Sequence, residues 1–123
     1  MTNLLLIIAF GLAISLACAA ARGPLEQAPR KASTSNRFEG NERAARAGAK
    51  LYGHECAGCH GANREGHGKA PSLARPAIHN AEPGALFWVL RNGSLKQGMP
   101  SFAHLPEAQR WQIITFLQTA GKP

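Results

Sequence analysis

The residues with the clearest chemical potential lie together in the segment HECAGCHG, which spans positions 54–61. Cys56 and Cys59 are separated by two residues, and His60 follows the second cysteine directly. Three kinds of site use such a pattern: a redox dithiol, part of a structural zinc site, or the covalent attachment of a haem. Other features of the sequence distinguish among these three kinds of site.

Two of these three sites find little support in the rest of the sequence. A redox dithiol is expected within a thioredoxin-like βαβ unit, and no segment here has the alternating pattern of a strand. A structural zinc site needs four ligands, but the chain has no second CxxC pair. In addition, the adjacent Cys59 and His60 are poorly placed to reach one tetrahedral ion together.

Haem attachment explains both the spacing of the cysteines and the position of the histidine. Cysteines three positions apart lie on one helical turn, so both sulfurs can reach the two vinyl groups on one edge of a porphyrin. His60 would then lie beneath the ring, where its imidazole can bind the iron. The pattern therefore predicts one covalent haem c attached through Cys56 and Cys59, which would leave neither thiol free for a disulfide.

A haem iron that only passes electrons needs a second axial ligand, and a methionine thioether is a frequent one that raises the reduction potential. Apart from Met1, the chain has a single methionine, Met99, in the segment GMPSF 39 residues after His60. Gly98 lets the backbone approach closely, and Pro100 stiffens the chain directly after the methionine. We therefore expect His60 and Met99 to be the two ligands of the iron.

Other residues compete for this second axial position. The candidates are His54, His67, His79 and His104. The first of them lies too near His60 in sequence to reach the opposite haem face easily, and we expect the other three to be solvated loop residues. The alternative role for Met99 is that of a core filler, which is unusual for a methionine between glycine and proline.

Helical patterns predict the elements that position these groups. The expected helices are Glu42 to Glu55, Pro83 to Asn92 and Pro106 to Thr119. Asn41 suits the N-cap of the first helix, Gly93 the C-cap of the second, and Pro106 the first position of the third. Gly48 is costly inside a helix unless another backbone comes close to it. With Gly- and Pro-rich loops between the helices and no strand pattern, the expected fold is all-α with long loops wrapped around the haem.

The chain from about Asn41 to Gly121 resembles the class I, single-haem cytochrome c family. The matching segments are AGAKLYGHECAGCHG, APSLA, LFWVLRNG, GMPSF and LPEAQRWQIITFLQTA. The first and fourth of these segments carry the specific motifs, and the helical segments alone would be weak evidence of the resemblance. The resemblance implies a cytochrome c-like fold, with the carbonyl of Pro71 bound to the second ring nitrogen of His60.

The resemblance also implies how the helices pack. Gly48 and Tyr52 would belong to an N-terminal helix that crosses the C-terminal helix near Trp111 and Ile114. The pair at positions 91–92, an arginine and an asparagine, would either contact a haem propionate or form a solvated helix end.

The N-terminus has the composition of an export signal. An apolar run from Leu4 to Ala21 ends in three alanines that fit a cleavage site, so residues 1–21 are expected to be a signal peptide. Two alternatives are a lipoprotein signal, with the lipid on Cys18 in the segment SLAC, and an uncleaved anchor helix. Since this kind of haem is attached outside the cytoplasm, we expect a periplasmic or exported protein, with a membrane tether if Cys18 is lipidated or the anchor helix is retained.

The remaining boundaries follow from composition. Residues 22–40 contain two prolines and little apolar content, so we expect a flexible basic linker there and a single cytochrome domain over 41–123. Fourteen basic and seven acidic residues give a net charge of +7. These charges are scattered rather than clustered with aromatic residues, which argues against nucleic-acid binding.

The expected function is that of a monomeric electron carrier, not an enzyme. Its partners would be redox proteins, namely a dehydrogenase or reductase on one side and an oxidase on the other. One alternative is a haem enzyme or a gas- or peroxide-reactive domain, if Met99 is not a stable ligand. Another is a fixed electron-transfer subunit of a membrane respiratory or dehydrogenase complex.

Overall fold

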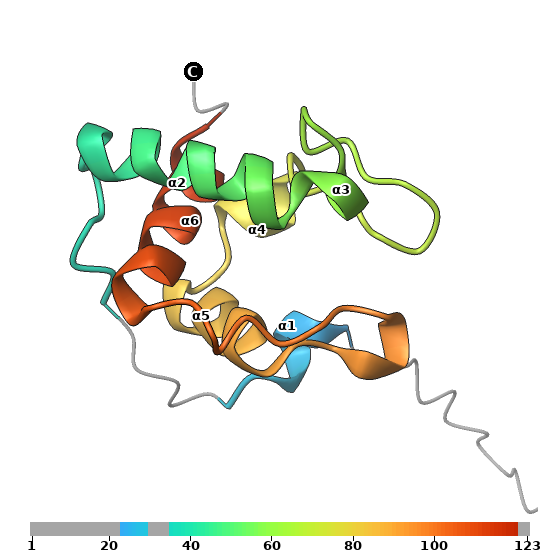
Figure 1. Cartoon of the computed structure of the whole chain (residues 1–123). Coiled ribbons are helices and arrows are strands. Elements are labelled where there is room, and N and C mark those ends of the chain that lie inside the picture. Colours follow the sequence, from blue (N-terminus) through green and yellow to red (C-terminus); the bar gives the residue numbers. More distant parts are fainter. Residues whose placement is uncertain (1–22, 30–34, 121–123) are drawn as a thin grey trace, which may run out of the picture.

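The computed structural model describes residues 23–29 and 35–120, and this part of the chain is helical (Figure 1). Its helices are α1 Pro24–Gln27, α2 Glu42–Glu55, α3 Ala57–His60, α4 Pro76–His79, α5 Pro83–Asn92, the 3-10 helix η1 Leu95–Gln97 and α6 Glu107–Thr119. Within the described ranges there is no strand, only two isolated bridges. The expected all-α fold is therefore confirmed. The expected signal sequence and Cys18 lie outside the described residues.

The three long helices begin and end close to the positions that their capping residues predict. Asn41 accepts a hydrogen bond from the Ala44 amide at 3.0 Å, which satisfies one of the free amides at the start of α2. Gly93 follows α5 as its C-cap with a φ of +68°, a conformation that favours glycine. α6 begins at Glu107, so Pro106 is its N-cap rather than its first helical residue.

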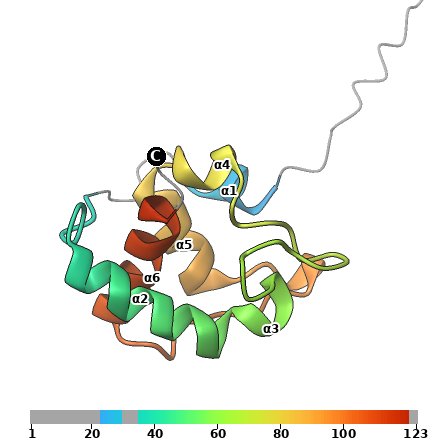
Figure 2. The same ribbon diagram turned by 90° about the horizontal axis from the view of Figure 1, so that it is seen from above.

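The fold is organised by the crossing of α2 and α6, the most extensive helix pair of the described chain (Figure 2). A Cβ placed on Gly48 would collide with the backbone carbonyl of Gln112, so the two helix backbones meet at this glycine. Next to this contact, the ring of Tyr52 packs against Phe116 with centroids 5.4 Å apart. The close backbone approach expected at Gly48 is therefore present.

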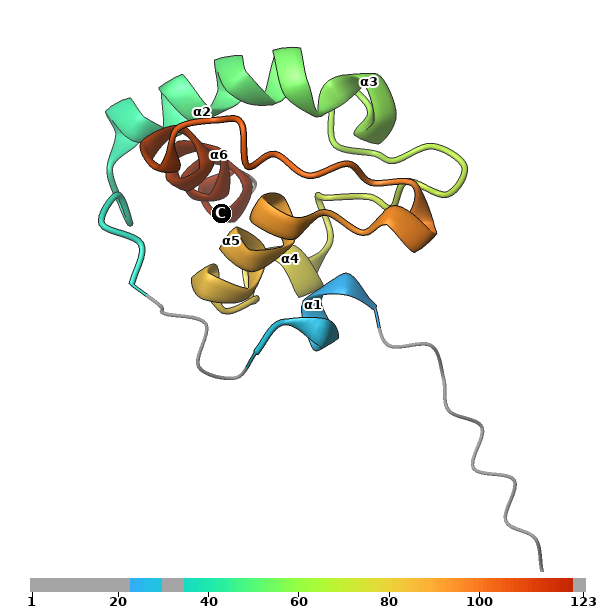
Figure 3. The same cartoon turned by 60° about the horizontal axis from the view of Figure 1, so that its bottom comes forward.

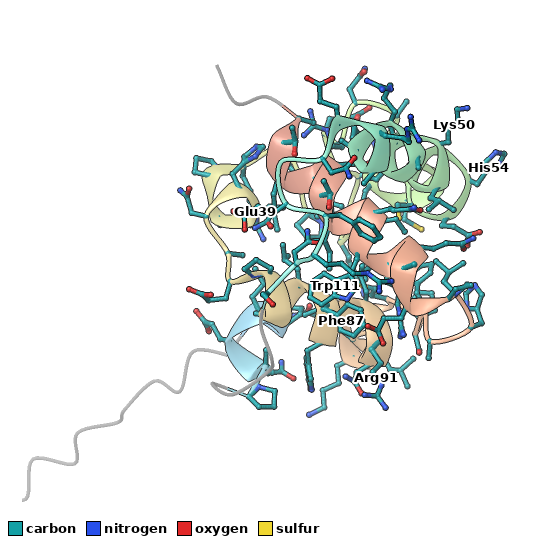
Figure 4. The ribbon with its side chains drawn as sticks, turned by 90° about the vertical axis from the view of Figure 1, so that its left-hand side faces the viewer. Glu39, Lys50, His54, Phe87, Arg91 and Trp111 are labelled. Carbon is teal, nitrogen blue, oxygen red and sulfur yellow. The ribbon has the colours of Figure 1, made fainter. Side chains whose placement is uncertain are left out.

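The crossing lies near Trp111, as the resemblance implied, because Gly48 meets the backbone of the next residue, Gln112. The ring of Trp111 stacks on Phe87 of α5, with centroids 4.3 Å apart and planes inclined by 20° (Figure 4). Ile113 and Ile114 have no exposed surface and form the inner face of α6. Thus α6 contacts α5 through the ring of Trp111, and it contacts α2 through the ring of Phe116 and the close approach at Gly48.

The segment expected to be a linker is partly packed onto the domain. Asn36 is buried, and its amide donates to the hydroxyl of Thr115 on α6 at 2.9 Å. Phe38 and Leu25 both pack against the hydrophobic core, the latter from α1. The short runs 23–29 and 35–40 therefore differ from a free linker, because each places at least one side chain in a site that the domain provides.

Among the described residues, no helix is long and apolar enough to cross a membrane.

Candidate haem site

Cys59 and His60 lie on the short helix α3, and Cys56 lies between α2 and α3. Cys56 is the C-cap of α2 and the N-cap of α3, and its carbonyl accepts hydrogen bonds from the amides of Cys59 at 3.2 Å and His60 at 2.9 Å. This single turn brings both sulfurs onto one stretch of the chain. Cys56 is buried and Cys59 is exposed, so the first faces the interior and the second the rim.

The environment of Cys56 keeps its thiol neutral. Burial, the carboxylate of Glu55 and the neighbouring Cys59 together raise the pKa of the Cys56 thiol to about 12. A neutral sulfur in an apolar wall behaves as a small hydrophobic group.

The described residues also contain no group of three or more His, Cys, Asp or Glu side chains that could hold a metal ion.

All five residues predicted for the site line one cavity of about 540 Å³. They are Cys56, Cys59, His60, Pro71 and Met99. Much of the remaining wall is apolar and comes from α4, α5 and α6, namely Ile78, Leu86, Val89, Leu90, Ile113, Ile114 and Leu117. The size of the cavity is typical of cofactor sites, and the mixture of an apolar wall with a few nitrogen and sulfur donors suits a haem.

The ring of His60 is held by a backbone carbonyl. Its Nδ1 lies 2.8 Å from the carbonyl oxygen of Pro71, and since a carbonyl can only accept, Nδ1 is the donor. This leaves the lone pair on Nε2, the nitrogen available to a metal. The hydrogen bond is the one that the resemblance implied for Pro71.

A tight loop brings Pro71 back to the histidine. Gly66 has a φ of +83°, and a Cβ on it would lie 2.6 Å from the Ser72 nitrogen and 2.7 Å from the Pro71 carbonyl carbon. Its amide donates to the carbonyl of His60 at 2.7 Å. Position 66 therefore needs a residue without a side chain, because the two segments of this loop pass close to each other there.

Arg64 closes the same loop and was not identified from the sequence. Its carbonyl accepts from the Leu73 amide at 2.8 Å and from the Ser72 hydroxyl at 3.0 Å, on the two residues after Pro71. Its guanidinium donates to the carbonyl of Ala120, at the end of α6, at 3.0 Å. An arginine in a polar loop carries no sequence signal for such a role, because the contact joins positions 56 apart.

The segment that carries Met99 is fixed to the end of α5. Ser94 and Met99 exchange two backbone hydrogen bonds of 2.9 and 3.0 Å around η1. A Cβ on Gly93 would lie 2.6 Å from the Pro100 carbonyl carbon and 2.7 Å from the Met99 oxygen, so this glycine permits the close approach. The amide of Phe102 then donates to the carbonyl of Leu90 at 2.7 Å. Met99 is half-buried and packs against the core beside the cavity.

Tyr52 connects α2 to the residue after His60. Its hydroxyl donates to the carbonyl of Gly61 at 2.6 Å and is buried. Burial, with smaller contributions from Cys56 and Glu65, raises the pKa of this hydroxyl to about 12, so the hydroxyl remains a donor at neutral pH. The resemblance had placed Tyr52 at the helix crossing, and the structure adds this hydrogen bond.

The other histidines lie in different surroundings. His54 lies on the exposed surface of α2 (Figure 4). His67 is exposed at the cavity rim, and His104 is exposed with Nε2 3.8 Å from the carboxylate of Glu55. His79 differs from the expected solvated loop residue, because it is half-buried on α4 and its Nε2 donates to the Ala74 carbonyl at 3.2 Å.

The two polar residues at the end of α5 do not line the cavity. Arg91 lines a separate groove beside Phe87 and Trp111, on the side of the molecule shown in Figure 4. Asn92 is exposed, and its amide donates to the Trp88 carbonyl at 2.8 Å. Of the two roles expected for this pair, the structure agrees with a solvated helix end.

An all-helical shell around one apolar cavity, with a CxxCH turn on its wall, defines the class of c-type cytochromes. Residues 43–117 match the family model described as cytochrome c oxidase, cbb3-type, subunit III. Because this match spans more than half of the chain, the chain belongs to that family. The family implies a covalent haem c and electron transfer through it.

A solved structure agrees with this assignment at the level of the fold. Cytochrome CL from the marine methylotrophic bacterium Methylophaga aminisulfidivorans MPT superimposes with a TM-score of 0.59 and 24% sequence identity. The likeness covers 68% of this chain and 59% of the cytochrome CL chain, so this chain corresponds to only part of that protein. No curated protein shows significant similarity to the chain.

Proposed function

We propose that this protein is a single-haem electron carrier in which Cys56 and Cys59 attach the haem and His60 and Met99 bind its iron. The observation that carries the proposal is that all four side chains line one largely apolar cavity. When bound, such a group supplies one-electron exchange between ferric and ferrous iron. The protein then has to hold the group, adjust its potential and limit the access of water.

His60 is prepared for its role by its hydrogen bond. The 2.8 Å contact from Nδ1 to the Pro71 carbonyl fixes the tautomer and the orientation of the ring. Donation from Nδ1 also increases the electron density at Nε2 and strengthens it as a ligand. The loop closed by Gly66 and Arg64 keeps the carbonyl in place.

Whether Met99 stays bound to the iron distinguishes an electron carrier from an enzyme. A thioether would favour the ferrous state of a bound haem, and an iron held by both His60 and Met99 would have no site for a substrate. The two backbone hydrogen bonds between Ser94 and Met99, and the close packing at Gly93, limit how far the methionine can move away. These contacts support a ligand that stays bound.

The cellular setting is part of the proposal. We infer that residues 1–21 direct export and that the domain functions in the periplasm, either free or tethered through the N-terminus or a lipid on Cys18. The family description supports a second candidate, a fixed subunit of a membrane respiratory complex, with the same site but a permanent partner. Fractionation of native cells, with haem staining of denaturing gels, would distinguish a free carrier, which is found in the soluble fraction, from a tethered carrier or a fixed subunit, which are both found in the membrane fraction.

Two substitutions test the site itself. Changing Cys56 and Cys59 together to alanine should abolish the haem stain on a denaturing gel, and a stain that persists would contradict covalent attachment there. Met99→Ala should keep the stain but lose the weak far-red charge-transfer band of methionine-ligated ferric haem. Its reduction potential should fall, and it should bind carbon monoxide faster than the wild type. A wild type that lacks the band, or binds carbon monoxide at once, would favour an enzyme.

A further inference from the structure

The segment 23–27 contributes to the cavity although it lies outside the residues that match the family model. Pro24 and Leu25 line the cavity, and Leu25 also packs against the hydrophobic core. α1, which carries both residues, lies against α5. It lies at the end of the molecule opposite α3, as the two views of Figures 1 and 3 agree. The cavity therefore has one wall that the cytochrome domain itself does not supply.

The local sequence explains why this segment presents a leucine to the cavity. Pro24 is the first residue of a single helical turn, and the Glu26 carboxylate accepts a hydrogen bond from the Gly23 amide at 3.2 Å. Glu26 and Gln27 are exposed, whereas Leu25 is half-buried. The turn thus has two apolar side chains, Pro24 and Leu25, which line the cavity, and two polar side chains, which are exposed to water.

We propose that residues 23–27 form a strap that closes this end of the haem pocket, and that Leu25 raises the reduction potential by excluding water. The inference rests on the proposed function. Ferric haem carries one more positive charge than ferrous haem, and water stabilises that charge better than an apolar side chain does. Burial is one of the means by which a protein adjusts the potential of a haem.

Leu25→Ala, with Leu95→Ala as its matched control, tests the strap. Both variants lose the same atoms and no charge, but Leu95 is 82% exposed on η1 and does not line the cavity. We expect Leu25→Ala to lower the reduction potential in a redox titration, while Leu95→Ala leaves it at the wild-type value. Leu25→Val should give an intermediate potential. Glycerol should also perturb the Soret band more strongly in Leu25→Ala than in the wild type, because more of the haem faces solvent.

The far-red band shows whether Leu25 acts through water or through the methionine. The strap predicts that the band stays intact in Leu25→Ala while the potential falls. An unchanged potential and Soret perturbation in Leu25→Ala would overturn the proposal, and so would loss of the band together with the fall in potential. If Leu25→Ala yields no folded protein, the reduction potential, Soret perturbation and far-red band of Leu25→Val are compared with those of the wild type, and the same outcomes test the strap. A wild type without covalent haem would instead refute the proposed function.

Discussion

Replacing Gly48 with alanine tests the contact on which the fold depends. The backbones of α2 and α6 meet at this residue, and the new Cβ would collide with the carbonyl carbon and oxygen of Gln112. A flexible side chain could turn aside, but a helix backbone cannot. The substitution therefore forces the two helices apart along their most extensive interface.

The expected cost follows from two opposing effects. Alanine is about 1 kcal/mol more favourable than glycine inside a helix. Overpacking typically costs about 1–3 kcal/mol, and a backbone obstacle places Gly48 at about the upper end of that range. We therefore expect Gly48→Ala to lower the free energy of unfolding by about 2 kcal/mol, the difference between these two effects.

Gly53→Ala is the matched control on the same helix. A Cβ on Gly53 meets no other atom within 4 Å, so this variant should gain about 1 kcal/mol from helix propensity alone. The two proteins should then differ by about 3 kcal/mol, which for a domain of this size is a gap of roughly 12–24 °C in melting temperature. Thermal and denaturant unfolding followed by circular dichroism would measure the gap. Equal shifts in the two variants, or a Gly48→Ala protein as stable as the wild type, would refute the close approach.

Three further changes test other parts of the structure. Trp111→Ala should destabilise the domain by about 3–5 kcal/mol, since it removes a buried ring stacked on α5; a loss below about 1 kcal/mol in denaturant unfolding would contradict the stack. Gly93→Ala should weaken the far-red band, because its Cβ would press on the Met99 carbonyl at 2.7 Å; an unaltered band would argue against this support. Asn36→Ala should cost about 1–3 kcal/mol by leaving the buried Thr115 hydroxyl without its donor, and wild-type stability would show that residues 35–40 are not part of the folded unit.

The long helices could be predicted because their signals are local. Asn41 as a cap and Gly93 after the last turn each satisfy backbone groups within a few residues, and Pro83 at a first helical position has no amide hydrogen to leave unpaired. The gathering of Cys56, His60 and Met99 at one cavity could also be expected, since a haem between two axial ligands requires it. Their roles in binding remain predictions.

What the sequence did not reveal depends on contacts between distant positions. Leu25 and Asn36 sit in polar stretches without helical periodicity, and their burial depends on surfaces that only the folded domain provides. The partner of Trp111 could not be chosen in advance, because an apolar stripe on α6 fits either α2 or α5. Arg64 was missed for a similar reason, because its guanidinium binds the Ala120 carbonyl while its own carbonyl accepts from Ser72, in a different part of the chain.

The hydrogen bond between Asn36 and Thr115 joins residues 79 positions apart, and the α2–α6 crossing joins Gly48 to Gln112, 64 positions later. Contacts of such long range require most of the loop-closure entropy to be lost before they form, which slows folding. The chain therefore cannot complete its core until its last helix has been synthesised. Until then the cavity lacks the part of its apolar wall that Ile113, Ile114 and Leu117 of this helix provide.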